Sequence, residues 1–136
     1  MGTRGPKSSA SLEVVNQANI ARLARPEPPS ELTDEQAAEW LAVVERLPAD
    51  WFQRETHGML AQYCRHVVDA RRVAQLIESA CGSDEFDVNE YDRLLKMQER
   101  EGRALSSLAT RMRMTQQATY DEKKKKPIRG AKPWDV

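Results

Sequence analysis

The spacing of apolar residues in two long stretches restricts the fold of this chain more than any other feature. Between residues 54 and 81, apolar or small side chains recur at alternating intervals of three and four residues. The same rhythm returns between residues 88 and 114. Steps of three and four keep side chains on one face of an α-helix. The positions in these two seams are Leu60, Tyr63, Val67, Ala70, Ala74, Ile77 and Cys81, followed by Tyr91, Leu95, Gln98, Gly102, Leu105, Ala109 and Met112.

This pattern predicts two helices of about 27 residues that pair as an antiparallel hairpin roughly 40 Å long. Gly82 is a suitable residue to end the first helix, and Asp87 can cap the start of the second. Gly102 costs about 1 kcal/mol relative to alanine inside a helix. We therefore expect the neighbouring helix to approach closely at Gly102.

A shorter amphipathic helix is predicted before the hairpin, over residues 34–47. Thr33 begins a Thr-Asp-Glu-Gln capping box, in which its hydroxyl accepts a hydrogen bond from the third residue of the helix. Pro48 ends this helix, and we expect Trp51 and Phe52 to close one end of the core. No stretch alternates as a strand does, so the predicted fold class is all-α.

Composition divides the chain into three parts. Residues 1–30 read as a flexible basic arm that can include a short helix and ends in a proline-rich linker. Residues 31–114 form the helical core and oligomerisation domain, and residues 115–136 add a short helix and a basic C-terminal tail. One covering helix cannot bury the whole apolar surface of the hairpin, so we expect identical chains to associate into closed rings or dimers.

Charge is segregated along a chain whose formal net charge is +0. Residues 31–50 contain six acidic residues and one arginine, whereas residues 115–136 contain six basic and three acidic residues. Basic residues between Gly and Pro can follow a phosphate backbone without fixed geometry, and they release counterions on binding. A merely solubilising role for the lysine run is the alternative. The residues that we expect to contact DNA are Arg4, Lys7, Lys123, Lys124, Lys125, Lys126, Arg129 and Lys132.

The sequence contains no residue set typical of catalysis or metal binding. His57 and His66 are nine residues apart on one predicted helix, so they face apart, and neither has a Cys or His partner at ligand spacing. Cys64 and Cys81 are expected to be core thiols in a reducing compartment. We expect no enzyme activity, no metal, no cofactor and no small-molecule substrate. The absence of a long apolar run predicts a cytoplasmic protein without a membrane partner.

The order of several motifs resembles the small subunit of tailed-bacteriophage terminases. These motifs are the initial GTRGPK, then PEPPSEL, the acidic helix DEQAAEWLAVVERL, the long stretch LAQYCRHVVDARRVAQLIESACG and the late LSSLATRMRMT. The resemblance implies a ring of subunits that binds viral DNA at the packaging start site, in the cytoplasm of the bacterial host. It also implies that this subunit presents the DNA to a large subunit, which holds the ATPase and the nuclease, for packaging into the procapsid.

Trp134 and Asp135 are candidates for the contact with that large subunit. Two other roles for Trp134 stay open, stacking on a base and packing on its own hairpin.

Other classes of protein compete with this interpretation. A helix-turn-helix transcription regulator is disfavoured because a proline-rich linker precedes an acidic helix. A non-catalytic helical adaptor would use the hairpin without binding DNA, and an RNA-binding scaffold would use the same basic ends.

Overall fold

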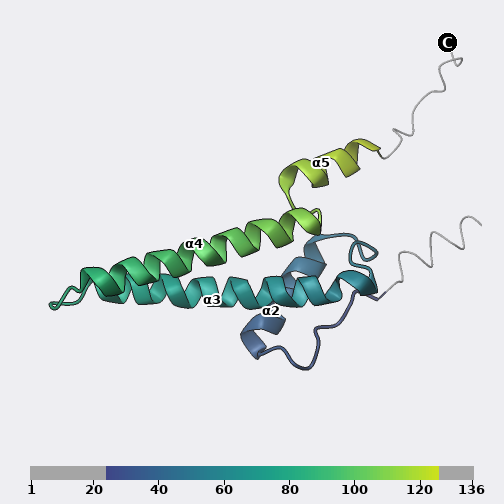
Figure 1. The fold of residues 1–136 in the computed structure, drawn as a ribbon. Helices are drawn as coiled ribbons and strands as arrows, with labels where there is room; N and C mark the ends of the chain where they lie inside the picture. The colour runs from purple at the N-terminus through teal and green to yellow at the C-terminus, as the bar shows by residue number, and fades with distance from the viewer. Residues whose placement is uncertain (1–23, 126–136) are drawn as a thin grey trace, which may run out of the picture.

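The described part of the chain, residues 24–125 of the computed structural model, consists of helices and short connections (Figure 1). The elements are α2 (Asp34–Arg46), the 3-10 helix η1 (Arg54–Thr56), α3 (His57–Cys81), α4 (Val88–Arg111) and α5 (Gln116–Lys125). No strand occurs within this range, and the predicted all-α class is confirmed. The predicted N-terminal arm, with nearly all of its short helix, and residues 126–136 lie outside the described residues. None of the described helices is long and apolar enough to cross a membrane.

The long helices α3 and α4 run side by side in opposite directions, and residues 82–87 join them at one end (Figure 1). Helix α2 packs on α3 near the other end. The main core lies there, around the fully buried side chains of Trp40, Leu60 and Cys64. Phe52 is buried in this cluster and Trp51 packs against it, so the prediction for these two residues is confirmed. The molecule is thick at the α2 end and only two helices thick at the turn.

The helix ends follow the predicted local chemistry. Thr33 forms both bonds of its capping box with Gln36. Asp87 caps α4 by accepting a hydrogen bond from the backbone of Asn89, at 2.9 Å. The hydroxyl of Thr115 accepts from the backbone of Ala118 in the first turn of α5. These caps satisfy backbone N–H groups that have no partner inside their own helix.

Helix α4 ends at Arg111, earlier than the predicted Met114. Arg113 adopts a positive φ of 56°, and the Met114 N–H reaches the Ala109 carbonyl at 2.8 Å. The Arg113 N–H bonds to the Thr110 carbonyl at 3.1 Å. These two bonds form a Schellman motif, which turns the chain out of α4 toward α5. No glycine marks this stop, and the sequence therefore did not reveal it.

The proline-rich segment before α2 is attached to that helix. The indole Nε1 of Trp40 donates a hydrogen bond to the Pro26 carbonyl at 2.8 Å. The guanidinium of Arg25 donates to the backbone carbonyls of Val44 and Leu47 near the end of α2. The segment around Arg25 and Pro26 is thus hydrogen-bonded to α2 and to the residue that follows it. This part of the predicted linker therefore belongs to the folded body.

Acidic side chains face arginines of α3. They come from α2 and from the segment directly before it. Glu39 pairs with Arg71, and Glu35 lies 3.8 Å from Arg72. A third carboxylate, Glu31, lies 3.9 Å from Arg65. Because these groups are largely exposed, each pair adds at most about 1 kcal/mol. Together they explain why an acidic helix docks where it does.

Only some of the seam residues are buried. The alternating spacing of three and four residues predicted that each seam would face one neighbouring helix along its whole length, and this prediction is corrected. On α3 the buried residues are Leu60, Ala61, Cys64, Val68 and Val73. The physical reason is that α3 has two neighbours on different faces, α2 and α4, so no single seam can face both.

Individual seam positions show the same correction. Ala74 is exposed, and Leu95 is 38% exposed. Cys81 is exposed, so the prediction of a core thiol holds for Cys64 and is wrong for Cys81. A Cβ atom built on Gly102 would have no neighbour within 4 Å, and the predicted close approach there is also wrong.

Candidate nucleic-acid interface

Most of the predicted DNA-binding residues fall outside the described range. These are Arg4, Lys7, Lys126, Arg129 and Lys132, together with the proposed partner residues Trp134 and Asp135. Lys123, Lys124 and Lys125 form the last turn of α5, which leads from α4 into the C-terminal tail. The predicted DNA contacts therefore lie outside the side chains that the structure describes.

The structure instead gathers basic residues on the outer face of α4. Helix α4 buries Leu94, and Met112 directly after it is buried as well. The opposite side carries five basic residues, whose spacing of three, four, three and eight keeps them on one face of the helix. These residues are Arg93, Lys96, Arg100, Arg103 and Arg111, and all five are exposed.

Ion pairing divides this basic face into two groups. Lys96 lies 2.8 Å from Asp92, and Arg103 pairs with Glu99, each one turn away on the same helix. Arg93, Arg100 and Arg111 have no ion pair or hydrogen bond among the described residues. We call these three residues the arginine row. At about 1.5 Å per residue, they stand roughly 10 and 16 Å apart along α4.

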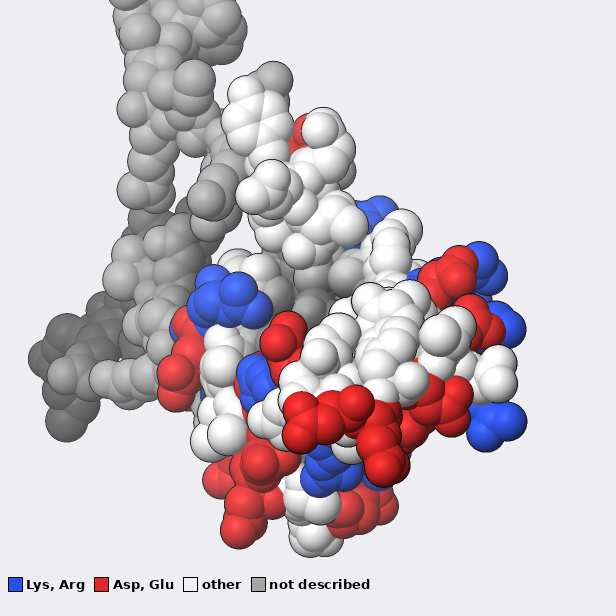
Figure 2. Space-filling view, turned by 90° about the vertical axis from the view of Figure 1, so that its left-hand side faces the viewer, with Lys and Arg blue, Asp and Glu red and all other residues white. Residues whose placement is uncertain are grey.

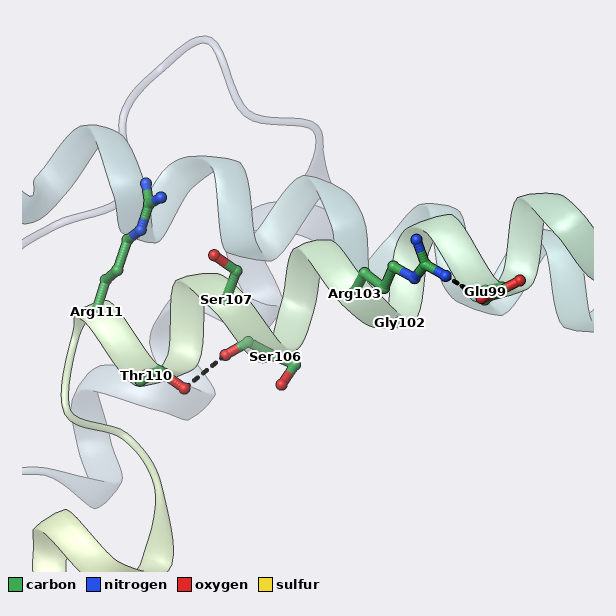
Figure 3. Close-up of a pocket in the computed structure, with 7 residues that line it drawn as sticks. All are labelled: Glu99, Gly102, Arg103, Ser106, Ser107, Thr110 and Arg111. Carbon is green, nitrogen blue, oxygen red and sulfur yellow. Dashed lines mark hydrogen bonds and ion pairs between the residues drawn. The ribbon is translucent and has the colours of Figure 1, made fainter.

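A shallow groove of about 780 Å³ follows the end of this face (Figure 3). All of its lining residues come from α4: Glu99, Gly102, Arg103, Ser106, Ser107, Thr110 and Arg111. Gly102 has no side chain and the two serines have small ones, which leaves room between the two arginines. Thr110 donates its hydroxyl hydrogen to the Ser106 carbonyl at 2.9 Å. Because the groove is open and lined by two arginines against one glutamate, it suits an extended anionic chain better than an enclosed small molecule.

The histidines and the buried cysteine have structural surroundings. His57 donates from Nε2 to the Phe52 carbonyl at 3.2 Å and meets the ring of Trp40 edge-on, with centroids 5.6 Å apart. His66 lies beside Glu101 between α3 and α4. Burial raises the pKa of the Cys64 thiol to about 12, so it is a poor nucleophile. Within the part that the structure describes, no cluster of three His, Cys, Asp or Glu side chains could hold a metal ion.

The arginine row was not predicted, because the most conspicuous basic residues of the sequence stand in runs near the ends of the chain. A signal was present in the spacing of basic residues between 93 and 111, which follows the helical period. The same signal occurs on α3, where Arg65, Arg71 and Arg72 turn out to be paired with acidic residues. Only packing separates free arginines from paired ones.

The chain was also compared with known proteins. No protein-family model, no curated protein sequence and no solved structure matches it.

Proposed function

We propose that this chain is the small, non-catalytic subunit of a tailed-bacteriophage terminase. It binds viral double-stranded DNA at the packaging start site and presents it to the large subunit, which cuts and translocates the genome. In this proposal α3 and α4 form the wall of a ring of identical subunits. The basic ends and the arginine row of α4 supply the phosphate contacts.

The observation that carries the DNA-binding part is the arginine row. Arg93, Arg100 and Arg111 are exposed and have no acidic partner among the described residues. A phosphate can therefore approach each guanidinium without displacing an internal carboxylate. By contrast, Arg71 and Arg72 of α3 would first have to leave Glu39 and Glu35. Arginine also contacts phosphate oxygens through two parallel N–H donors, which favours α4 over a surface of lysines.

The order of sequence motifs supports the choice of terminase among DNA-binding proteins. The all-helical architecture agrees with that choice, and so does the basic segment that continues from α5. A helical adaptor without a nucleic-acid role would have no use for three unpaired arginines on one face. That difference makes the two candidate functions separable by one measurement.

The test is duplex DNA binding, followed by fluorescence anisotropy at several salt concentrations. Wild-type protein should bind, and log K should fall linearly with log salt concentration. In the Arg93→Gln/Arg100→Gln variant, the slope should become shallower by up to about 0.9 for each phosphate contact removed. The matched control is Arg46→Gln/Arg54→Gln, which removes two exposed arginines from other elements and should bind nearly as well as wild type.

Absence of binding even at low ionic strength would overturn the proposal in favour of the helical adaptor. Equal losses in the α4 variant and in the control would show that only net charge matters. Competition with RNA of equal length separates a DNA-binding subunit from an RNA-binding scaffold. Native mass spectrometry of the wild-type protein tests the ring, since a strict monomer contradicts it.

A further inference from the structure

The turn between α3 and α4 carries an exposed apolar patch. Phe86 is 50% exposed and Val88 is 67% exposed. The rings of Phe86 and Tyr91 lie 5.3 Å apart, and Leu95 follows one turn after Tyr91 on the same face of α4. We call Phe86, Val88, Tyr91 and Leu95 the tip patch. Monomeric proteins seldom expose aromatic and aliphatic groups together at the thinnest point of the fold, so the patch indicates a docking surface.

The surroundings of the tip patch are strongly acidic. Between Arg72 and Arg93 the chain has six acidic residues and no lysine or arginine. Only Asp92 among them forms an ion pair, with Lys96. The unpaired acidic residues are Glu78, Asp84, Glu85, Asp87 and Glu90. Figure 2, which looks onto this end of the molecule, shows uncoloured atoms bordered by red acidic residues. The unpaired carboxylates at this end would attract a basic partner.

The chain itself contains a segment with the complementary chemistry. Residues 123–136 carry six basic residues against Asp135, and they include Trp134. An indole is a frequent anchor in apolar pockets at interfaces, and the surrounding lysines match the carboxylates around the tip patch. We propose that residues 123–136 of one copy dock on the tip patch of a second copy. Trp134 packs on Phe86 and Val88 there, and the basic residues meet Asp84 and Glu85.

Chain length excludes docking on the same copy. Helix α4 has 24 residues and therefore holds the tip about 36 Å from its own C-terminal end. Figure 1 shows that α5 leaves that end on the side away from the turn. The nine residues from Lys125 to Trp134 span at most about 32 Å when fully extended. Trp134 therefore cannot reach the tip of its own chain, and the contact joins different molecules head to tail.

This inference goes beyond the proposed function, because it concerns contacts between copies and does not require DNA. The chain offers a native probe for it, since Cys81 is exposed at the end of α3 next to the turn and Cys64 is buried. One full-length protein keeps Cys81 and has no other change. A second, distinguished by a size tag, carries Cys81→Ser and Val136→Cys. The two are mixed and oxidised with diamide, which accepts the two electrons released as the disulfide forms.

We expect a disulfide-linked heterodimer on a non-reducing gel. Asp84→Lys/Glu85→Lys in the first protein should reduce its yield several-fold, because the side chains that attract the basic segment are reversed. Adding Arg129→Glu/Lys132→Glu to the second protein should then restore the yield. Asp50→Lys/Glu55→Lys is the matched control, since it reverses two other acids without ion pairs and should leave the yield unchanged.

Three results would overturn the inference. The first is the absence of the heterodimer. The second is a heterodimer whose yield is changed by neither charge reversal. The third is a disulfide within one chain when Cys81 and Val136→Cys are combined in a single protein at high dilution, because this would show docking on the same copy. The charge-reversed proteins should retain the circular dichroism of wild type, since neither Asp84 nor Glu85 uses its carboxylate in a hydrogen bond of the described structure. Failure of DNA binding would leave all of these outcomes unaffected, so the two proposals fail separately.

Discussion

The Nδ1 atom of His66 on α3 lies 2.5 Å from the Oε2 atom of Glu101 on α4. Gln62, one turn earlier on α3, places its amide nitrogen 3.2 Å from the other ring nitrogen of His66. If the amide donates there, Nδ1 carries the hydrogen that Glu101 accepts. This polar link crosses the interface between the two long helices at a half-buried position. It therefore helps to hold α3 and α4 in register.

Removal of the Glu101 carboxylate should weaken the contact between α3 and α4. Glu101→Ala leaves the ring nitrogen of His66 without its partner, and we expect a loss of roughly 1–2 kcal/mol in the free energy of unfolding. Urea denaturation of His66→Ala, Glu101→Ala and the double variant gives the coupling between the two residues. The exposed pair of Arg103 and Glu99 is the control, for which about 0.3–0.5 kcal/mol is expected. Equal coupling in both pairs would contradict the special role of His66.

Trp40 joins the core to the proline-rich segment through one side chain. It is fully buried, and its N–H reaches the Pro26 carbonyl. Trp40→Phe removes that donor and leaves a cavity, so unfolding should become easier by about 2–4 kcal/mol. A glutamate-specific protease should then cut faster after Glu31, because the segment loses its attachment to α2. Unchanged cleavage after Glu31 beside a clear loss of stability would show that the segment is held by other contacts.

The two cysteines should differ sharply in reactivity. Burial raises the pKa of Cys64 from 9.0 to about 12, whereas Cys81 is exposed. At pH 8 a thiol reagent such as Ellman's reagent should modify one thiol per folded chain quickly and the second only after denaturation. Cys81→Ser should abolish the fast phase. Fast modification of two thiols in the native protein would contradict the burial of Cys64.

The raised pKa of Cys64 also predicts how the free energy of unfolding changes with pH. Between pH 9 and 12 the unfolded chain loses the Cys64 proton more readily than the folded chain does. The contribution of Cys64 to the free energy of unfolding is therefore complete below pH 9 and is lost as the pH rises toward 12. Comparison of wild type with Cys64→Ala across this range isolates the effect, since the variant lacks the titrating group.

Arg113 occupies the left-handed position that ends α4. A side chain with a Cβ atom is strained there by about 1 kcal/mol, and a β-branched one is strained further. Arg113→Gly should thus be as stable as wild type or more stable by up to about 1 kcal/mol, because its greater unfolded-state entropy offsets part of the relief. Arg113→Val should be clearly less stable than Arg113→Gly in thermal unfolding. The reverse order would mean that the chain leaves α4 in another way.

Local chemistry in the sequence was sufficient to predict the elements of this fold. The Thr33 capping box, the Asp87 cap and the stop at Pro48 depend on neighbours within a few residues, so they can be read without knowledge of packing. The same holds for the helical period of the seams, which located α3 and α4 to within a few residues. The end of α4 was misplaced because Arg113 takes a conformation that sequence rules assign to glycine.

Only the tertiary structure decided which charged side chains of those helices have no internal partner and can bind another molecule. Arg71 and Arg100 are both exposed arginines on long helices, and neither has an acidic residue three or four positions away in the sequence. Arg71 pairs with Glu39 of α2, which is 32 positions away in the sequence, whereas Arg100 faces solvent on the side of α4 that no described helix covers. Helical period fixes the direction of a side chain relative to its own axis. Which residues the side chain meets in that direction depends on long-range packing. That packing leaves the arginine row of α4 without acidic partners and leaves the acidic residues around the tip patch exposed.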